Sequence, residues 1–479
     1  MQAPRNRSRL TESDAWRIGR LDAHGQAELL ARRELTSLEL VEAAVLRIER
    51  VEPKLNALTV KAFDAARERA AKLASPVGMQ GVPYLLKDGL DYPGMPSRSG
   101  SRSKAASAPV SVRHEYAKRL DEAGLIPLGK TNVPEFGLLP TTESLLYGPA
   151  HNPWGLDHSP GGSSGGAGVV VAAGMVALGH AADGGGSIRI PASCCGVVGL
   201  KPTRNANARA RDPHFIEDFL VNDVLLSRSV RDTAWAFALE NPHGRPMVRP
   251  DATPRKLRIA VAPRSMLGAM PHEDVASAIS RTADLCAKLG HQVTDARPGI
   301  DGPAVSDSFK TIWGYLASGT LNLVKAANPG TALDTILERW TLELAEFCRT
   351  LDGEDLERTF AQATHATAVM REFFRSYDVV LSPVVLTPPP KIGALGPMRP
   401  IAQLMPEMFD YVSYTPLHNL TGLPALSLPL FTSREGLPIG SMFAADRDNE
   451  DVLLGLAYEL ERAAPWAERW PDIAAPGGA

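Results

Sequence analysis

The sequence predicts an α/β fold from its composition and from one run of alternating elements. Of the 479 residues, 44% are hydrophobic and 22% are charged, which is the balance of a soluble globular protein able to bury a large core. Residues 257–262 and 292–293 look like strands, and residues 274–289 between them look like a helix. This order is that of a βαβ unit. The length allows one large domain or two to three smaller ones.

The N-terminal part begins with helix and leads to a strand. Thr36 and Glu39 form a capping-box pattern, and the apolar residues that follow have helical spacing: Leu38, Val41, Val45 and Ile48. We expect Pro53 to end this helix. Residues 81–86 are a short apolar run between turn residues, which predicts a strand with Lys87 at its end.

Residues 149–203 are unusually rich in glycine and serine and carry almost no charge. Residues 161–166 (GGSSGG) predict a loop, residues 167–175 a buried helix of small side chains, and residues 176–179 a strand. Three glycines then precede Ser187, and a proline suited to a first helical turn lies four residues further on. Ser187 is therefore expected at a strand-to-helix turn.

The remaining elements continue the mixed pattern. Residues 206–212 are small and polar with two arginines, which predicts a mobile surface loop that could act as a lid. The apolar residues 379–381 lie just before a proline-rich stretch. Near the end of the chain, residues 425–428 and 439–443 predict strands and residues 448–463 a final helix.

The turn at Ser187 could support hydroxyl chemistry. A serine nucleophile needs a base, donors for the oxyanion and an acid for the leaving group. Glycines let successive backbone N–H groups point to one place, and the start of a helix favours negative charge there. A tight turn without chemistry is the alternative interpretation. The G-x-S-x-G pattern of a nucleophile elbow is absent, because Arg189 stands at its last position.

The base for such a serine could be a histidine or a lysine. His158 and His180 lie near the glycine-rich segment, but each is more typical of a structural histidine. A lysine base needs a neutral amine, which burial among hydroxyl groups can produce by lowering its pKa.

Residues 124–131 (GLIPLGKT) match the phosphate-binding pattern G-x-x-x-x-G-K-T. The context argues against a nucleotide site, because residues 114–123 look helical where a strand is required. The four residues between the glycines are apolar or proline, which favours a strand entering the core. We therefore disfavour a P-loop NTPase.

Charge and cysteine content narrow the functional classes. Lys and Arg total 51 against 54 for Asp and Glu, so the net charge of −3 offers no bulk attraction to nucleic acid. No apolar run approaches the ~20 residues of a membrane helix. The four cysteines fit neither a zinc site nor a disulfide framework, so a reducing cytoplasm is expected.

Several segments taken together resemble the amidase signature family. They are GVPYLLKD (81–88), GGSSGG (161–166), DGGGSIR (183–189) and IPASCCGVVGLKPT (190–203). The resemblance covers nearly the whole chain and is strongest to the branch of 6-aminohexanoate cyclic dimer hydrolases. Two positions depart from the usual pattern: Gly184 replaces a threonine, and Arg204 with Asn205 replaces Gly-Arg.

The resemblance implies a single α/β/α domain with a large mixed twisted sheet, and it implies no cofactor and no metal. It places the nucleophile at Ser187, a bridging serine at Ser163 and the base at Lys87. The bond between Gly162 and Ser163 is expected to be cis. Further roles implied by the resemblance are an oxyanion hole formed by the backbone N–H groups of Gly184, Gly185, Gly186 and Ser187, and a supporting ion pair formed by Asp183 and Arg189.

We divide the expected domain, residues 1–479, into four parts. They are a helical part at about 10–75, a catalytic core at about 80–230, a variable substrate region at about 250–410, and C-terminal strands with a helix at 411–470. Five residues are candidates for the substrate pocket: Thr142, Tyr147, Arg209, Trp313 and Tyr315.

The expected reaction is cleavage of the C–N bond of small or oligomeric amides through an acyl-enzyme. Carbamates, esters and anilides present a similar carbonyl to the same residues and are the alternative substrates. A subunit of a tRNA-dependent transamidase is less favoured, because the chain has no basic bias and no recognisable docking segment. We expect a small-molecule substrate, no nucleic-acid or membrane partner, and allow for a homodimer.

Overall fold

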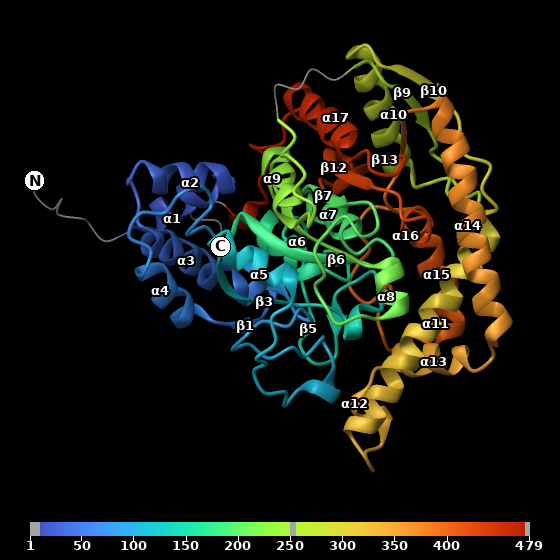
Figure 1. Ribbon diagram of the computed structural model, residues 1–479, viewed down its shortest axis with the longest axis horizontal. Helices are drawn as coiled ribbons and strands as arrows, with labels where there is room; N and C mark the ends of the chain where they lie inside the picture. Colours follow the sequence, from blue (N-terminus) through green and yellow to red (C-terminus); the bar gives the residue numbers. More distant parts are fainter. Residues whose placement is uncertain (1–9, 250–254, 475–479) are drawn as a thin grey trace, which may run out of the picture.

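The computed structural model describes residues 10–249 and 255–474, which form a mixed α/β fold (Figure 1). One sheet has the strand order β1 (Leu58–Lys61), β3 (Ile126–Thr131), β2 (Pro83–Lys87), β6 (Leu178–Asp183) and β8 (Asn222–Ser227). The second has the order β10 (Gln292–Asp295), β9 (Arg258–Val261), β11 (Val379–Pro383), β13 (Pro438–Ala445), β12 (Ala425–Thr432) and β7 (Gly199–Lys201). A short hairpin joins β4 (Glu143–Ser144) and β5 (Gly148–Pro149).

Both large sheets contain parallel and antiparallel neighbours. Strand β2 is parallel to β3 and β6, whereas β8 is antiparallel to β6. An isolated bridge joins the edge strands of the two sheets, and the N–H of Val198 donates to the carbonyl of Ser227 at 2.8 Å. The strands therefore continue from one sheet to the other, and the predicted mixed α/β class is confirmed.

The predicted βαβ unit is present near the middle of the chain. Strands β9 and β10 are parallel, with Arg258 opposite Gln292, and α10 (Glu273–Lys288) connects them. The buried side chains of α10, such as Val275 and Ile279, lie one helical turn apart. The apolar pattern of the sequence therefore located this unit.

The N-terminal helices lie together on one side of the molecule, drawn in blue in Figure 1. They are α1 (Glu12–Gly19), α2 (Ala23–Ala31), α3 (Ser37–Leu55) and α4 (Phe63–Ala71). The capping box of Thr36 and Glu39 starts α3 as predicted. Pro53, however, does not end the helix. Leu55 is fully buried and Asn56 closes the last turn in the left-handed conformation, so these contacts outweigh the one hydrogen bond that proline removes.

The glycine-rich segment forms a helix, a strand and a second helix in the predicted order. Helix α6 (Gly165–Ala172) leads to β6, and α7 (Arg189–Cys195) begins two residues after Ser187. Helix α6 starts two residues earlier than predicted. A side chain at Gly166 would lie 2.5 Å from the backbone nitrogen of Asn132, so only glycine allows this close approach.

The segment that matches a phosphate loop is strand β3, in the interior of its sheet. Helix α5 (Glu115–Glu122) precedes it, and the ammonium group of Lys130 donates to Ser97 Oγ at 2.6 Å within the core. The structure therefore contains no phosphate cradle here, as expected.

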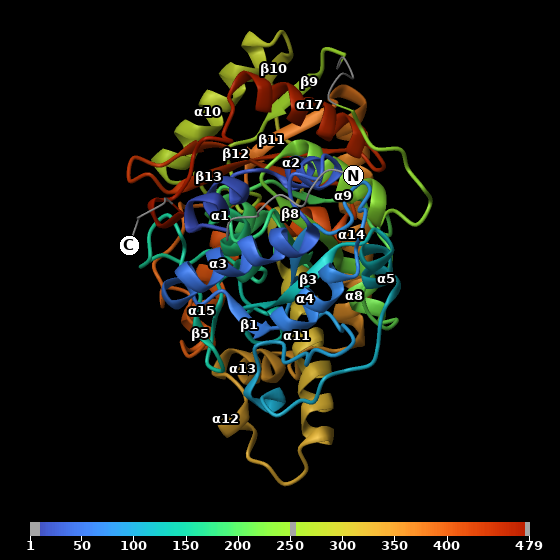
Figure 2. The same cartoon turned by 90° about the vertical axis from the view of Figure 1, so that its left-hand side faces the viewer.

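Long helices flank the second sheet, on the right of Figure 1. Helix α11 (Gly302–Ala327) packs against α13 (Arg339–Cys348) and α14 (Gly353–Ser376), and its far end leads to the short α12 (Leu333–Ile336), at the bottom of Figure 2. The other helices are α8 (Phe215–Leu220), α9 (Val230–Glu240), α15 (Ile401–Tyr411), α16 (Pro416–Leu420) and α17 (Glu450–Ala463), with short 3-10 turns η1 (Arg102–Lys104), η2 (Glu135–Gly137) and η3 (Asp472–Ala474). Across the described ranges, no helix combines the length and apolar character needed to span a membrane.

Residues 206–212 are held in place, which corrects the prediction of a mobile loop. The N–H of Ala208 donates to the carbonyl of Glu240 at 2.7 Å, and the carbonyl of Arg209 accepts the N–H of Tyr116 at 3.0 Å. Ala206, Ala208 and Ala210 are all buried. The small residues that suggested mobility serve here as close-packing residues.

Candidate active site

Lys87 is the last residue of β2 and its side chain is buried. Its ammonium nitrogen lies 2.8 Å from Ser163 Oγ and 3.2 Å from the carbonyl oxygen of Ala182. Burial lowers the pKa of Lys87 to about 7, against the opposing influence of the carboxylates of Asp223 and Asp183. A substantial fraction of this amine is therefore neutral near pH 7 and can accept a proton.

Ser163 lies in the glycine loop before α6, and the Gly162–Ser163 peptide bond is cis, as the resemblance implied. The loop is tightly enclosed, because a side chain at Gly162 would lie 2.5 Å from the carbonyl oxygen of Thr141. The neighbouring Ser164 hydroxyl bonds instead to the backbone N–H and carbonyl of Ala182, each at 3.2 Å. Of these two serines, Ser163 is therefore the one whose hydroxyl bonds to the Lys87 amine.

Ser187 follows the glycines between β6 and α7, and its side chain is mostly buried. It lines a cavity of about 490 Å³ together with Lys87 and Ser163. Its hydroxyl makes no hydrogen bond within the described part of the chain. The structure thus brings the three predicted residues to one cavity, with the Ser187 hydroxyl unengaged.

A buried ion pair fixes the turn that carries Ser187. Asp183 accepts hydrogen bonds from Arg189 Nε at 2.9 Å and from Asn419 Nδ2 at 2.9 Å, and both members of the ion pair are fully buried. Burial alone would raise the pKa of Asp183, but the Arg189 guanidinium and these hydrogen bonds lower it well below its usual range. Arg189 also donates to the carbonyl of Thr415 at 3.0 Å, which ties the turn to α16.

The backbone donors of this turn are not equivalent. The N–H of Gly186 donates to Asp183 Oδ1 at 2.6 Å, so it is already engaged and does not belong to the predicted oxyanion set in this structure. The N–H groups of Gly184, Gly185 and Ser187 have no hydrogen-bond partner among the described residues. Gly186 has φ 135°, and this conformation turns its N–H toward the carboxylate.

His180 is a supporting residue rather than a base. Its Nδ1 accepts the backbone N–H of Lys87 at 3.2 Å, so its proton is on Nε2, which lies 3.1 Å from Asp223 Oδ1. Burial lowers the pKa of His180. Asp223 also pairs with Arg211, which in turn lies 3.3 Å from a carboxylate oxygen of Glu217.

His158, the second histidine near the glycine-rich segment, is not at the site. Its Nδ1 lies 2.8 Å from Asp157, and its backbone bridges to Lys391, away from the cavity lining.

Of the five predicted pocket residues, the structure brings only Trp313 to the cavity. Thr142 supports the glycine loop by donating to the carbonyl of Gly161 at 2.9 Å. Tyr147 donates to Asp88 at 3.2 Å, Arg209 pairs with Asp218 at 3.0 Å, and Tyr315 donates to the carbonyl of Asp352 at 2.8 Å. Each of these four side chains makes a hydrogen bond or an ion pair, and none of them lines the cavity.

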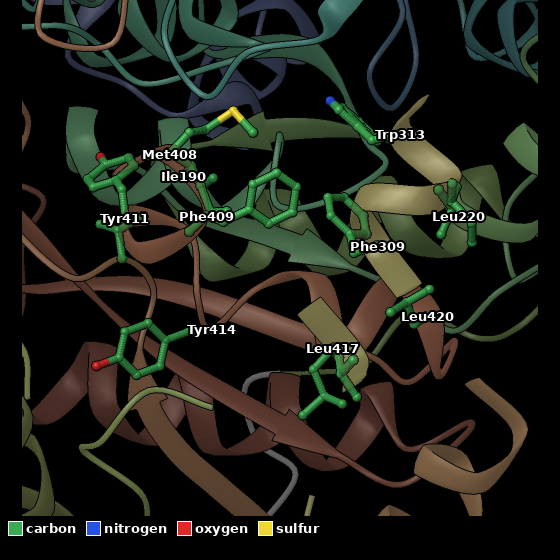
Figure 3. Close-up of a cluster of buried hydrophobic side chains, with 14 of the residues drawn as sticks. Ile190, Leu220, Phe309, Trp313, Met408, Phe409, Tyr411, Tyr414, Leu417 and Leu420 are labelled. Atoms are coloured by element: carbon green, nitrogen blue, oxygen red, sulfur yellow. The ribbon is translucent and has the colours of Figure 1, made fainter. Parts of the chain in front are cut away.

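Trp313 is held rigidly in place. Its indole N–H donates to the carbonyl of Leu138 at 3.0 Å, and its ring stacks on Phe309 with centroids 5.0 Å apart. The Phe309 ring also contacts Phe409, with centroids 5.9 Å apart, and Figure 3 shows the three side chains in the surrounding apolar cluster. Phe309 also explains Gly185, because a side chain there would lie 2.3 Å from the Phe309 ring.

Sequence reasoning missed most of the apolar lining. Most of it comes from η2 and the residues around it, from the C-cap of α8, and from one face of α11: Val133, Phe136, Leu138, Val221, Leu316, Leu323 and Val324. The helical spacing of the α11 residues indicates an apolar helix face. The spacing alone cannot tell whether that face packs against the core or lines a cavity.

Comparison with known proteins identifies the family. The family described as Amidase matches residues 39–454. A Mycobacterium tuberculosis protein bearing the name of an amidase, AmiC, is 38% identical over 469 residues, covering 95% of this chain and 98% of that protein. The 6-aminohexanoate-cyclic-dimer hydrolase of Paenarthrobacter ureafaciens is 32% identical over 502 residues, covering 98% of this chain and 99% of that protein.

The fold comparison agrees with the sequence comparison. A solved structure of 6-aminohexanoate cyclic dimer hydrolase superposes with a TM-score of 0.86 at 31% identity, covering 96% of this chain and all of the other. A family match over most of the chain, full-length relatives above 30% identity and the same fold all agree. The chain therefore belongs to the amidase family and is a hydrolase of carbon–nitrogen bonds in amides.

Proposed function

We propose that the protein is an amidohydrolase that cleaves small or oligomeric amides through an acyl-enzyme on Ser187. The observation that carries this proposal is the 2.8 Å hydrogen bond between the Lys87 amine and Ser163 Oγ, in the cavity that Ser187 also lines. A buried amine with a lowered pKa that bonds to one hydroxyl, in a cavity that a second serine also lines, can activate a serine nucleophile without a histidine.

Each of these residues has its own role in the proposed reaction. Neutral Lys87 accepts the proton of Ser163 as Ser163 takes the proton of Ser187, whose oxygen then bonds to the amide carbon. The N–H groups of Gly184, Gly185 and Ser187 stabilise the resulting oxyanion. The proton returns through Ser163 to the amine as the C–N bond breaks, and water then hydrolyses the acyl-enzyme by the same relay.

Carbamates, esters and anilides are the alternative substrates, because each presents a carbonyl of similar geometry to Ser187. For oligomeric amides a relative gives a precedent, because its name identifies 6-aminohexanoate cyclic dimer as its substrate. We assign the choice between them to the variable region at about 250–410, which contains α11. A transamidase role is less favoured, because the net charge is −3 and gives no bulk attraction to tRNA.

We also propose the compartment in which the enzyme works and that it needs no second kind of subunit. All four cysteines are free and buried, which suits a reducing compartment such as the cytoplasm. Isolated as a single protein, as a monomer or as a homodimer, the chain is expected to be active. Activity that appeared only when a second, different subunit was added would favour the transamidase alternative.

The test is a panel of aryl and alkyl amides, linear oligoamides, carbamates and esters, followed by amine or alcohol release. We expect hydrolysis by the purified protein and none by Ser187→Ala, which removes one hydroxyl and little packing. Ser193→Ala is the matched control, because Ser193 lies in α7 and only accepts the N–H of Gly440 at 2.8 Å. Full activity in Ser187→Ala with an unchanged thermal transition would refute the proposed function.

A further inference from the structure

Among the described residues, five charged side chains besides Lys87 line the cavity, and four of them are engaged within the protein. The five are Asp88, Lys104, Arg211, Glu217 and Asp223. Arg211 pairs with both Asp223 and Glu217. Asp88 accepts the backbone N–H of Arg98 at 2.9 Å and the hydroxyl group of Tyr147 at 3.2 Å. Of the five, only the Lys104 side chain has no hydrogen bond or ion pair within residues 10–249 and 255–474.

The unpaired Lys104 ammonium stands at the mouth of the cavity. Lys104 is the last residue of η1, and its side chain is exposed. Its ammonium nitrogen lies 6.0 Å from the centre of the Phe136 ring, which also lines the cavity. Ser99, a further lining residue, has a hydroxyl group without a hydrogen-bond partner in the described part of the chain. An ammonium group and a hydroxyl group with no partners of their own suit an anionic group of a ligand.

The backbone beside Lys104 is held in an unusual conformation. Ser99 and Phe136 both have φ 50°, in the left-handed region that residues other than glycine rarely adopt. The N–H of Phe136 donates to the carbonyl of Ser99 at 2.8 Å, which joins the two strained residues. Strain of this kind is concentrated at catalytic and ligand-binding sites. It therefore favours a binding role for this side of the cavity.

This side of the cavity adjoins the serine that protonates the leaving group. A side chain at Gly137 would lie 3.2 Å from Ser163 Oγ, so η2 is in contact with this serine. Phe136 precedes Gly137 in η2, and its ring lies between this contact and Lys104. In the proposed reaction Ser163 gives its proton to the departing nitrogen, so the nitrogen lies next to Ser163. The group bonded to the nitrogen is therefore the half of the substrate that lies nearest to Lys104.

We propose that the enzyme prefers amides whose amine half carries a carboxylate, which binds the Lys104 ammonium and the Ser99 hydroxyl group at the mouth of the cavity. This inference rests on the proposed function and names its substrate class, the N-acylated amino carboxylic acids. Because the Phe136 ring separates Ser163 from Lys104, the carboxylate should be several bonds away from the scissile nitrogen. Hydrolysis then releases a carboxylic acid and a free amino carboxylic acid.

The experiment measures kcat/KM for three pentanoyl amides by the release of pentanoate. Their amine halves are 5-aminopentanoate, 5-aminopentan-1-ol and 1,5-diaminopentane, which end in a carboxylate, a neutral hydroxyl group and an ammonium group. An exposed ion pair changes an affinity by about 1.4- to 5-fold, so kcat/KM for the carboxylate compound should exceed that for the ammonium compound at least about threefold at low ionic strength. The ratio should fall toward one in about 0.5 M NaCl, because salt screens exposed charges.

Two charge reversals show whether Lys104 causes this preference. Lys104→Glu should invert the ratio of kcat/KM for the carboxylate and ammonium compounds. Lys72→Glu is the matched control, because Lys72 is exposed outside the cavity lining and its substitution makes the same change in net charge. Its ratio should stay within about twofold of wild type.

A pair of isomers tests which half of the amide carries the carboxylate. The pentanoyl amide of 5-aminopentanoate carries it on the amine half, and the monobutylamide of hexanedioic acid carries it on the acyl half. Lys104→Glu should lower kcat/KM for the first at least about threefold more than for the second. Equal values for the carboxylate and ammonium compounds in wild type, an equal effect of the two charge reversals, or an equal loss for the two isomers would overturn this inference and leave the proposed function intact. Absence of hydrolysis for every one of these compounds and for the whole substrate panel would overturn both.

Discussion

Two buried lysines on adjacent parallel strands have similar surroundings, but only one of them can be reached from the cavity. Lys87 in β2 donates to Ser163 at 2.8 Å, and Lys130 in β3 donates to Ser97 at 2.6 Å. Burial lowers the pKa of Lys87 to about 7 and that of Lys130 to about 8. Only Lys87 and its serine line the cavity. A buried amine with a lowered pKa beside a hydroxyl therefore occurs at both positions, and access to the cavity that Ser187 also lines distinguishes the candidate base.

The largest expected effect is the difference between these two lysines on substitution. Lys87→Ala should lower kcat/KM by about 10²–10⁴-fold, because general-base catalysis contributes on this scale. Lys130→Met should stay within about tenfold and act on thermal stability, since it removes a buried hydrogen bond to Ser97 and neither residue lines the cavity. Steady-state kinetics and thermal unfolding of both variants check this prediction. Equal losses of activity in the two variants would remove the distinction.

A similar contrast exists between the adjacent serines. Ser163→Ala should lose activity by several orders of magnitude, because it interrupts proton transfer between Ser187 and Lys87. The variant should still fold, with a loss of about 0.5–1.5 kcal/mol in the free energy of unfolding, because the substitution removes one buried hydrogen bond to Lys87 and little packing. The measurement is kcat/KM beside the circular dichroism melting curve. An active Ser163→Ala would show that Lys87 can reach Ser187 without a bridge.

Some of this site could be predicted from the sequence and some could not. The glycine run, the helix start after Ser187 and the strand before Lys87 are local patterns, and the structure confirms those elements. The engagement of the Gly186 N–H by Asp183 depends on the fold of the turn. Similarly, the small residues at 206–212 could not indicate whether they were mobile or packed, because this depended on contacts with Glu240 and Tyr116.

The buried ion pair behind Ser187 should matter for stability. Asp183→Asn leaves the Arg189 guanidinium buried without its carboxylate, which costs about 3–5 kcal/mol in the free energy of unfolding. Urea denaturation measures this loss. Glu354→Gln removes a carboxylate from an exposed helical pair with Arg358 and should leave the denaturation midpoint unchanged. A midpoint for Asp183→Asn equal to wild type would mean that the turn does not depend on this pair.

The pH dependence of kcat/KM tests which residue is the base. In the proposed reaction Lys87 acts only when it is neutral, so kcat/KM should rise as pH increases through about 7. The Asp223 carboxylate favours the charged amine, so Asp223→Asn should move this acid limb to lower pH. His158→Gln should leave the limb in place. A limb near 6.5 that survived in Lys87→Ala but disappeared in a His158 or His180 variant would point to a histidine base.

The smallest expected effect is that of metal removal. In the proposed reaction the Ser187, Ser163 and Lys87 side chains supply nucleophile, relay and base, so dialysis against EDTA should leave kcat/KM unchanged. Loss of activity in EDTA that zinc restored would instead indicate a metal-activated water in place of Ser187.

The most direct test of the account is to trap the covalent intermediate. Enzyme mixed with excess 4-nitroanilide substrate is quenched in acid within milliseconds and digested, and the acyl group is located by mass spectrometry. We expect the acyl group on the peptide that carries Ser187, at a level that falls to zero in Ser187→Ala, and a rate of formation that rises with pH through about 7. Acylation of another residue, or turnover by a Ser187→Ala enzyme that forms no adduct, would contradict the account.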